Sequence, residues 1–592
     1  MIKILPSGTS GIIEHGLKPV RSSRIRGRFG NTAKEQTFRF DPLTLHARWK
    51  SNRIETGLVF ESEIYLRSIA LDFRFRSPRH SGDTTVWTES IRDSIRHGNL
   101  KTIPGTFSQK TRRDGSWAIW IAEAADTEGL FLRQSPPGDY PIRFFCNPLS
   151  RVLKITWEIN RMFSEGDTLT LPHVGISQGR MDRLLPSWQR EWKQTSRREL
   201  LQDRRTGWCG GKEIEAPKDL REVLTSFRSR KIKTDWYALG PDYVSEIGDW
   251  LFPSDNFKDR MGSLSRTIAE HNIIPGLRFA PFLVSKKSRI AIEKRDWLVK
   301  NAKGNPLSLP GYNGGKESLH VLDLSLPAVI KHVAHTFAVM KDQWGFRAYH
   351  LERLGDAGIP GMRSDNRLNE NQLISTAGTA IREALGNRVL IISSGLPLLT
   401  SPDIWDARVI SPQTDGSAAY TRRKRKNIFA SAVSTMIHRS FWNESSWINT
   451  SGILPPDIFS PENNQISRTL RTAVVLSCGM ISLSGDPRNM DGETRDTLKD
   501  FLELFQDCRK GRLSTIPGLG GGNHQPLIVR NDSGWIGLFN LSNRKKEVLL
   551  DREELKTGLG VSSNLSAGDD TVFNSPEIHV ALPPMGCRLF RG

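Results

Sequence analysis

The chain has 592 residues, 37% of them hydrophobic and 25% charged, a composition that is typical of folded multidomain proteins and excludes a largely disordered chain. Its formal net charge of +20 favours polyanionic partners. No apolar run reaches the roughly 18 residues of a membrane-spanning helix, and the opening stretch MIKILPSGTSG lacks the apolar core of a secretory signal. We therefore expect a cytoplasmic protein without a membrane span.

The first part of the chain, residues 1–195, predicts a β-sandwich. Hydrophobic and polar residues alternate in GLVFESEIYLRSIALDFRF (57–75) and SWAIWIAEA (116–124), which is the period of strands with one buried face. Turn residues such as SPPGD (135–139) separate the runs. Helical periodicity is nearly absent, so we expect this part to be entirely β.

The middle part, residues 200–512, alternates short apolar runs with amphipathic helical segments. The runs are TGWCGG (206–211), TDWYALG (234–240), IIPGLRFAPFLV (273–284), AYHLER (348–353), VLIISSG (389–395), ARVISP (407–412), TMIHRSFW (435–442) and VVLSCGMISLSG (474–485). The helical segments include 219–230, 261–272, 328–344 and 370–385. Eight strands alternating with helices predict a central (β/α)8 TIM barrel, whose site is built by the loops that follow the strands.

The last part, residues 520–592, returns to strand patterns. WIGLFNLS (535–542), KEVLLD (546–551) and PEIHVALPPMGCRLFR (576–591) predict a C-terminal antiparallel β-domain of the sandwich type, and GLGGGN (518–523) reads as the joint before it.

The five cysteines, at positions 146, 209, 478, 508 and 587, are scattered and odd in number. Neither a disulfide framework nor a Cys-x-x-Cys metal site fits this spacing, so we expect reduced, mostly buried thiols. No metal and no cofactor is expected.

Many segments of the barrel part, in the same order, resemble the melibiase-type alpha-galactosidases of glycoside hydrolase family 36. These segments are GWC (207–209), IGDWL (247–251), IPGLRFAPFLVS (274–285), RDWLV (295–299), VLDLSLPAV (321–329), WGFRAYHLERLGDAGIPGMRSDN (344–366), SSGLPLL (393–399) and WDARVISP (405–412). The ending VALPPMGCRLFR also resembles the closing strand of that family. The resemblance implies a three-part fold and a retaining glycosidase mechanism that uses two carboxylates.

The resemblance places Glu352 at the catalytic nucleophile. The family has an Asp there, in a Lys-x-Asp motif that aligns with His350, Leu351 and Glu352. Glutamate is a competent nucleophile, although its extra methylene moves the attacking oxygen by about 1 Å. The acid/base Asp of the family aligns with Gln413, which cannot donate and retake a proton, and Asp415 is the candidate replacement.

Other pocket positions also depart from the family pattern. Gly240 and Pro241 stand where the family has an Asp pair, and Asp242 lies just beyond. Arg278 replaces a Trp on the third strand, and Glu444 lies in a segment aligned with family residues after the seventh strand. The residues retained from the family pattern are Asp249, Trp250, Asp296, Trp297, Asp323 and Arg408.

Each candidate also has a purely structural interpretation. Glu352 could form an ion pair in a closed barrel mouth, and Asp415 could serve a turn before a glycine. Arg278 is either an anion clamp or part of a structural salt bridge. Trp250 and Trp297 either stack on a sugar or pack in the core. His350 is either a proton shuttle or a buried histidine with satisfied hydrogen bonds.

Two functional hypotheses follow. The first is a glycosidase of the alpha-galactosidase type that acts on an oligosaccharide or another glycoside. Its pocket would be reshaped for an acidic glycan by Arg278, His350 and Arg353. Glu352 would be its nucleophile, and Asp415 or Glu444 its proton donor. The second is a degenerate relative that binds carbohydrate or another partner without catalysis. Nucleic-acid binding rests on charge alone, because no motif accompanies the basic runs VRSSRIRGR (20–28), SRRELLQDRR (196–205) and TRRKRK (421–426). A homo-oligomer is left open.

Overall fold

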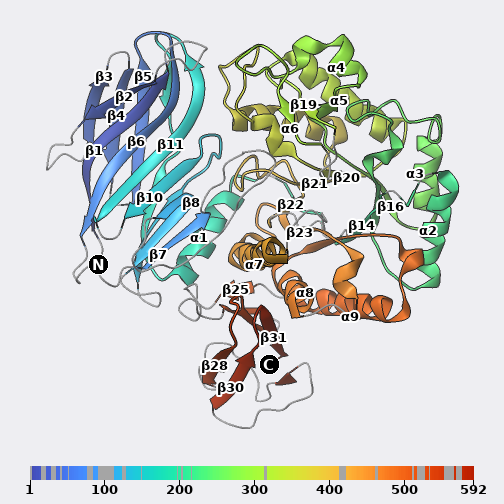
Figure 1. The fold of residues 1–592 in the computed structure, drawn as a ribbon. Helices are drawn as coiled ribbons and strands as arrows, with labels where there is room; N and C mark the ends of the chain where they lie inside the picture. Colours follow the sequence, from blue (N-terminus) through green and yellow to red (C-terminus); the bar gives the residue numbers. More distant parts are fainter. Residues whose placement is uncertain are drawn as a thin grey trace.

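A computed structural model gives the arrangement of the chain (Figure 1). The residues that it describes are 3–14, 22–27, 35–40, 43–50, 52–76, 85–90, 113–122, 128–147, 150–196, 198–201, 205–211, 213–214, 216–311, 317–411, 422–460, 465–509, 513–515, 527–531, 534–551, 566–567 and 577–591. Within these residues, no helix has both the length and the apolar character needed to cross a membrane.

The N-terminal part forms a folded antiparallel sheet. Its described strands are β1 (Lys3–Glu14), β2 (Ser22–Gly27), β3 (Glu35–Phe40), β4 (Leu43–Trp49), β5 (Arg53–Phe60), β6 (Ile64–Arg76), β7 (Thr85–Ser90), β8 (Arg113–Ala122), β9 (Gly129–Gln134), β10 (Ile142–Asn147), β11 (Val152–Phe163), β12 (Thr168–Thr170) and β13 (Val174–Gly179). Strands β5 and β6 lie far apart in the strand order, yet Leu58 and Ile69 belong to one core. The sheet therefore folds over on itself as a sandwich.

The expectation that residues 1–195 are entirely β is wrong in one place. Helix α1 (Met181–Lys193) follows the last strand of the sandwich. Leu185, Trp188 and Trp192 are all buried on one side of it, and their spacing of three and then four residues is helical. The helix also contains a proline, Pro186, a residue that disfavours a helix when only the sequence is considered.

The central part is a closed barrel of eight parallel strands, as predicted. They are β14 (Thr206–Cys209), β15 (Trp236–Leu239), β16 (Ile274–Phe279), β20 (Ala348–Leu351), β21 (Leu390–Ser393), β22 (Ala407–Val409), β23 (Ile448–Leu454) and β24 (Met480–Ser484), in this order around the barrel. The helices that accompany them are α2 (Pro217–Ser229), α3 (Met261–Glu270), α4 (Arg289–Glu293), α5 (Pro327–Asp342), α6 (Glu370–Leu385), α7 (Arg422–Arg439), α8 (Gln465–Ser477) and α9 (Gly492–Cys508). The four predicted helical segments correspond to α2, α3, α5 and α6.

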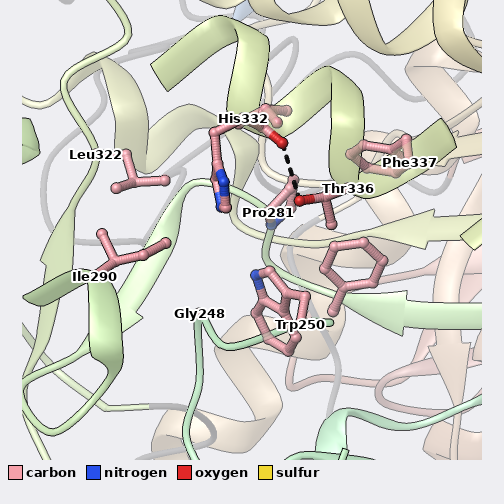
Figure 2. Close-up of a pocket in the computed structure, with 10 residues that line it drawn as sticks. Gly248, Trp250, Pro281, Ile290, Leu322, His332, Thr336 and Phe337 are labelled. Carbon is pink, nitrogen blue, oxygen red and sulfur yellow. Dashed lines mark hydrogen bonds between the residues drawn. The ribbon is translucent and has the colours of Figure 1, made fainter. Parts of the chain in front are cut away.

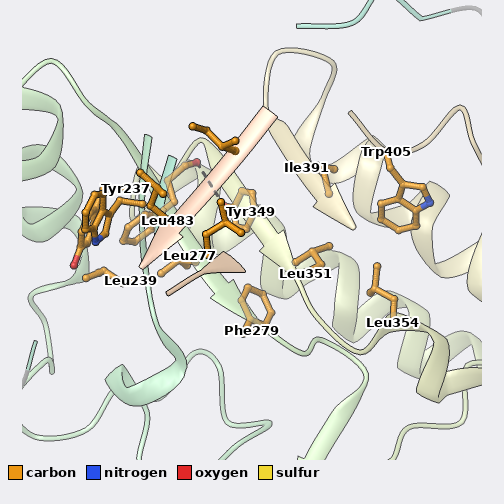
Figure 3. Packing of buried hydrophobic residues seen from close by; sticks show 14 of the residues in the cluster. Tyr237, Leu239, Leu277, Phe279, Tyr349, Leu351, Leu354, Ile391, Trp405 and Leu483 are labelled. Carbon is orange, nitrogen blue, oxygen red and sulfur yellow. Dashed lines mark hydrogen bonds between the residues drawn. The ribbon is translucent and has the colours of Figure 1, made fainter. Parts of the chain in front are cut away.

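Alternation along the strands divides the barrel side chains into two sets. Tyr237, Leu277 and Tyr349 belong to the large core between strands and helices, part of which is shown in Figure 3. Trp236 and Ala348, one residue before Tyr237 and Tyr349, belong to a separate cluster inside the barrel. The inner side of the barrel is therefore a packed interior, and chemistry is confined to its ends.

The seventh strand is not where the sequence predicted it. The run TMIHRSFW (435–442) forms the end of α7 and the 3-10 helix η5 (Ser440–Trp442), and the strand is β23 instead. The sequence of β23 is INTSGIL, in which Asn449, Thr450 and Ser451 are buried. Residues 422–426 of the third basic run form the beginning of α7.

An insertion after the third strand adds a small sheet of β17 (Leu283–Ser285), β18 (Ser308–Leu309) and β19 (Leu319–Val321). The chain ends in two further antiparallel sheets, formed by β25 (Leu513–Thr515), β26 (Leu527–Asn531), β27 (Trp535–Asn540), β28 (Lys546–Asp551), β29 (Ser566–Ala567), β30 (Glu577–Leu582) and β31 (Gly586–Arg591). The predicted joint 518–523 lies outside the described residues. All five cysteines are buried and unbonded, as predicted.

Candidate active site

Glu352 directly follows β20, the fourth barrel strand, and so lies at the carboxyl end of the barrel. Nη1 of Arg278 donates to both carboxylate oxygens of Glu352, at 3.2 and 3.3 Å. Arg278 is on the neighbouring strand β16, and its neighbours Leu277 and Phe279 both face the outer core, so its own side chain faces the barrel axis. The Glu352 side chain is 5% exposed, so Glu352 and Arg278 form a largely buried ion pair.

His350 lies one inward-facing position below Glu352 on the same strand. Its Nδ1 is 3.5 Å from the Sγ of Cys209 on β14. Burial lowers the pKa of His350 to about 4, with Glu352 acting in the opposite direction. Burial raises the pKa of the Cys209 thiol to about 12. Both groups are therefore neutral near pH 7, and neither is suited to be a proton shuttle or a nucleophile there.

Glycines line the barrel end beside Arg278. Nη2 of Arg278 donates to the carbonyl oxygen of Gly210 at 3.3 Å. A Cβ at Gly240 would lie 2.7 Å from the same oxygen, 3.3 Å from Nη2 of Arg278 and 3.4 Å from a carboxylate oxygen of Asp242. Arg278 therefore bonds to the Gly210 carbonyl and the Glu352 carboxylate, and the exposed Asp242 carboxylate lies close to Gly240.

The two other arginines predicted near the site point elsewhere. Arg353 adopts a left-handed backbone conformation with φ of 54°, and its Nε donates to Asp356 at 2.6 Å. The buried Arg408 donates to the carbonyl oxygens of Leu398 and Thr400 and lies over the ring of Trp447. Arg408 therefore secures the loop after β21, and a sugar-binding role is not supported by its contacts.

Asp249 and Trp250 have structural contacts in the loop after β15. The Asp249 carboxylate accepts the backbone N–H of Arg289, the first residue of α4, at 3.0 Å. Trp250 is buried against Phe279, with ring centroids 4.8 Å apart. Because Phe279 faces the outer core, Trp250 packs behind the barrel wall and is not available for sugar stacking. Of the two interpretations of Trp250, the structure therefore favours packing in the core over stacking on a sugar.

Trp250 also lines a narrow cavity, shown in Figure 2. The cavity has a volume of about 10 Å³, enough for about one water molecule. It lies beside α5, where Thr336 Oγ1 donates to the carbonyl oxygen of His332 at 3.0 Å. The half-buried Trp297 packs against His332, with ring centroids 5.5 Å apart. The cavity is too small for a sugar, so this region is distinct from the Glu352 site.

Glu444 lies at the opposite end of the barrel. It precedes β23, and its carboxylate is 2.9 Å from Nη2 of Arg205, the residue before β14. Both residues are therefore at the amino ends of parallel strands, whereas Glu352 is at a carboxyl end. The prediction that Glu444 binds substrate or donates the proton is therefore wrong. The seventh strand was predicted at 435–442, which put Glu444 after the strand, whereas Glu444 precedes the strand β23.

Asp415 and Gln413 lie outside the described residues. Within the described ranges, no group of three or more His, Cys, Asp or Glu side chains is arranged to hold a metal ion. The sequence did not reveal the contact between Cys209 and His350, or the position of Tyr237, whose hydroxyl lies 2.3 Å from where a Cβ of Gly210 would be. These contacts join β14, β15 and β20, and only the strand order of the barrel could have predicted them.

Comparison with solved structures identifies the architecture. The chain is similar to an alpha-galactosidase from Thermus thermophilus in complex with stachyose, with 16% identity over 79% of this chain and 99% of that one, at a TM-score of 0.54. It is also similar to a family GH36 alpha-galactosidase from Geobacillus stearothermophilus in complex with 1-deoxygalactonojirimycin, with 11% identity over 100% of this chain and 86% of that one, at a TM-score of 0.61. The chain has the family 36 fold.

Within this family 36 fold the sequence is divergent. The galactosidase domain of an alpha-galactosidase-sucrose kinase aligns with the whole chain at a TM-score of 0.62 and only 11% identity. No protein-family model matches the sequence. The family 36 resemblance found in the sequence is thus confirmed at the level of the fold, and the departures at the Glu352, Arg278 and Gln413 positions agree with the low identity.

Proposed function

We propose that the chain is a retaining glycosidase of the alpha-galactosidase type with Glu352 as its nucleophile. The observation that supports this proposal is the position of the Glu352 carboxylate, at the carboxyl end of the fourth barrel strand and bonded by Arg278 from the third. Active sites of TIM barrels lie at this end. The proposed substrate is a glycoside; the similar Thermus thermophilus and Geobacillus stearothermophilus structures contain stachyose and raffinose.

In the proposed reaction, a Glu352 oxygen forms a bond to the anomeric carbon while the glycosidic C–O bond breaks. The leaving oxygen takes a proton from the acid group, for which we propose Asp415. Water then attacks the glycosyl-enzyme, loses its proton to the same group and releases Glu352. Arg278 would orient the carboxylate before attack, and it would lose part of this contact once the ester forms.

A second candidate function is carbohydrate binding without hydrolysis. The observation that favours it is that both oxygens of the buried Glu352 already accept bonds from Arg278. Such pairing lowers the nucleophilicity of a carboxylate in the ground state. In addition, Gln413 stands at the position where the family has its proton donor.

Hydrolysis of aryl alpha-galactosides with good leaving groups tests the first function, because such substrates need little acid assistance. We expect Glu352→Gln to lower kcat at least 1,000-fold. Glu317→Gln is the matched control, since Glu317 is an exposed residue that pairs with Lys287 on the surface. Its rate should stay within twofold of the wild type.

Azide distinguishes a nucleophile from a residue that only supports the fold. In Glu352→Ala, azide should occupy the space of the removed carboxylate and yield a glycosyl azide of inverted anomeric configuration. No turnover by the wild type, together with retained galactoside binding, would instead establish the second function. Equal activity of Glu352→Gln and the wild type would exclude Glu352 as nucleophile.

A further inference from the structure

The segment after β17 carries a dense group of exposed cations. Residues 286–303 contain seven basic and two acidic residues. The exposed cations around α4, which we call the α4 basic surface, are Lys286, Lys287, Arg289, Lys294 and Arg295. Lys287 pairs with Glu317 at 2.9 Å, and the other four form no ion pair with any described residue. Unpaired cations gathered on one surface attract anions.

Exposed apolar side chains lie within this surface. Phe252 is 51% and Ile292 64% exposed, and they are two of the three large hydrophobic residues that are exposed in the described part of the chain. The guanidinium of Arg289 lies 4.1 Å from the centre of the Phe252 ring. Ile292 is three residues after Arg289 on α4, so the two share one face of the helix. Phe252 and Ile292 therefore give this charged surface an apolar component.

The α4 basic surface belongs to the same end of the barrel as Glu352. It is part of the insertion that follows the third strand, close to α5 at the upper right in Figure 1. The backbones of Lys300, in this insertion, and Met362, in the loop after β20, exchange hydrogen bonds of 3.0 and 2.7 Å. Arg353, next to Glu352 in the chain, donates to the carbonyl oxygen of Pro310 at 3.0 Å. The insertion thus adjoins the loop that follows the site.

We propose that the α4 basic surface, with Phe252 at its edge, binds an acidic polysaccharide chain that carries carboxylate or sulfate groups. Guanidinium and ammonium groups match these anions, and an aromatic face packs against the C–H groups of a sugar ring. The proposal rests on the proposed function for the carbohydrate nature of the partner. A membrane surface is a poorer match, because α4 has only five residues and offers no extended amphipathic face.

The test measures binding without turnover. The full chain is titrated with dextran sulfate, polygalacturonate and neutral dextran at several salt concentrations. The test variant is Lys286→Glu/Lys294→Glu/Arg295→Glu. The matched control is Lys218→Glu/Arg221→Glu/Arg228→Glu, which changes the net charge equally on the exposed side of α2. Phe252→Ala probes the aromatic contact separately.

We expect the test variant to bind both acidic polymers at least tenfold more weakly than the control does, and its affinity to depend less steeply on salt. Phe252→Ala should weaken binding about threefold with an unchanged salt dependence. Neutral dextran should not compete. Equal losses in the test variant and the control would overturn the proposal, because net charge alone would then explain binding.

Two further outcomes would overturn the proposal, because they would assign the surface to another partner. The first is tighter binding to duplex DNA than to either acidic polymer. The second is binding to vesicles of anionic phospholipid that is lost in the test variant. Glu352→Gln separates this proposal from the proposed function, because its polymer affinity should equal that of the wild type. Normal hydrolysis of aryl galactosides without polymer binding would support the proposed enzyme function and would overturn the proposal that the α4 basic surface binds a polymer.

Discussion

The two ends of the barrel each bury a carboxylate beside arginine, but they do so differently. At the amino end, Asp406 is fully buried; one oxygen accepts from Arg198, and the other accepts from Arg382 at 2.8 Å and from the backbone N–H of Ile391 at 2.7 Å. At the carboxyl end, the contacts of Arg278 with Glu352 are longer, at 3.2 and 3.3 Å.

The comparison teaches how to separate a structural carboxylate from a candidate catalytic one. Asp406 joins the segment before β14, helix α6 and the start of β22, so its bonds hold the barrel together. Glu352 is held by Arg278 of a neighbouring strand, and Arg278 in turn contacts the carbonyl oxygen of Gly210. Asp406 therefore has a structural role, whereas Glu352 lies at the carboxyl end, where the active sites of TIM barrels are built.

The largest effect is expected for Asp406→Ala. This change removes the carboxylate that Arg198, Arg382 and the Ile391 N–H share, while the two arginines keep carbonyl acceptors such as the oxygen of Ile404. Because the buried guanidinium groups lose their counter-charge, the free energy of unfolding should fall by about 3–5 kcal/mol. Chemical denaturation of the full chain measures it. Asp496→Ala, at an exposed surface pair, should change the unfolding free energy by less than about 1 kcal/mol. Similar values for the two variants would refute the structural role of Asp406.

The next effect is the pH dependence that comes from His350 at the carboxyl end. Burial lowers its pKa to about 4, whereas the unfolded chain should have the ordinary value near 6.5. The unfolded state therefore takes up the proton first as the pH falls, and stability decreases from about pH 6.5 down to about pH 4, by roughly 3 kcal/mol in total.

Denaturation at pH 7.5 and pH 4.5 checks this sign. His350→Gln should lose less stability than the wild type between the two pH values, because glutamine does not titrate. Cys209, Glu352 and Arg278 surround His350 and stay the same in both proteins. An equal loss in the two proteins would mean that His350 titrates normally in the folded chain.

A smaller effect is expected when a side chain is added at Gly210, at the carboxyl end. In Gly210→Ser, the new Cβ would lie 2.3 Å from the hydroxyl of Tyr237, so stability should fall by about 1–3 kcal/mol. Tyr237→Phe should recover part of this loss in the double variant, since the Tyr237 hydroxyl is buried and has no hydrogen-bond partner among the described residues. Thermal unfolding of the two single variants and the double variant measures the coupling; additive losses would contradict it.

The smallest effect is expected for Glu444→Gln at the amino end. The Glu444 side chain is 39% exposed and pairs with Arg205, so its loss should lower stability by less than about 1 kcal/mol. The rate of aryl galactoside hydrolysis should stay within twofold of the wild type. A hundredfold loss of rate with an unchanged unfolding free energy would instead show that Glu444 takes part in catalysis.

The barrel could be predicted from the sequence where its strands are apolar. AYHL and LIIS are recognisable as buried strands, whereas INTSGIL is not, because its buried Asn449 is satisfied by bonds that only the tertiary structure supplies. Asn449 donates to the carbonyl oxygen of Arg439 and accepts from the indole of Trp447. Local hydrophobicity does not reveal such a strand.

The site was predictable only in part for a similar reason. The position of Glu352 at a strand end follows from the local pattern, but Arg278 is 74 residues away in the chain. Within the basic run 196–205, Arg198 and Arg205 are bonded to carboxylates at the amino end of the barrel. Charge clusters in a sequence do not show which cations fold inward, and the α4 basic surface became recognisable only through its exposure.

The tryptophans of α1 have a consequence for how the protein can be divided. Trp188 packs against Trp442 of the barrel part, with ring centroids 4.9 Å apart, and against Phe131 of the sandwich. A barrel cut free before residue 196 would expose Trp442 and Leu398 to water, and an apolar face of this kind promotes aggregation. Fragment work on this chain should therefore retain the sandwich and α1 together with the barrel.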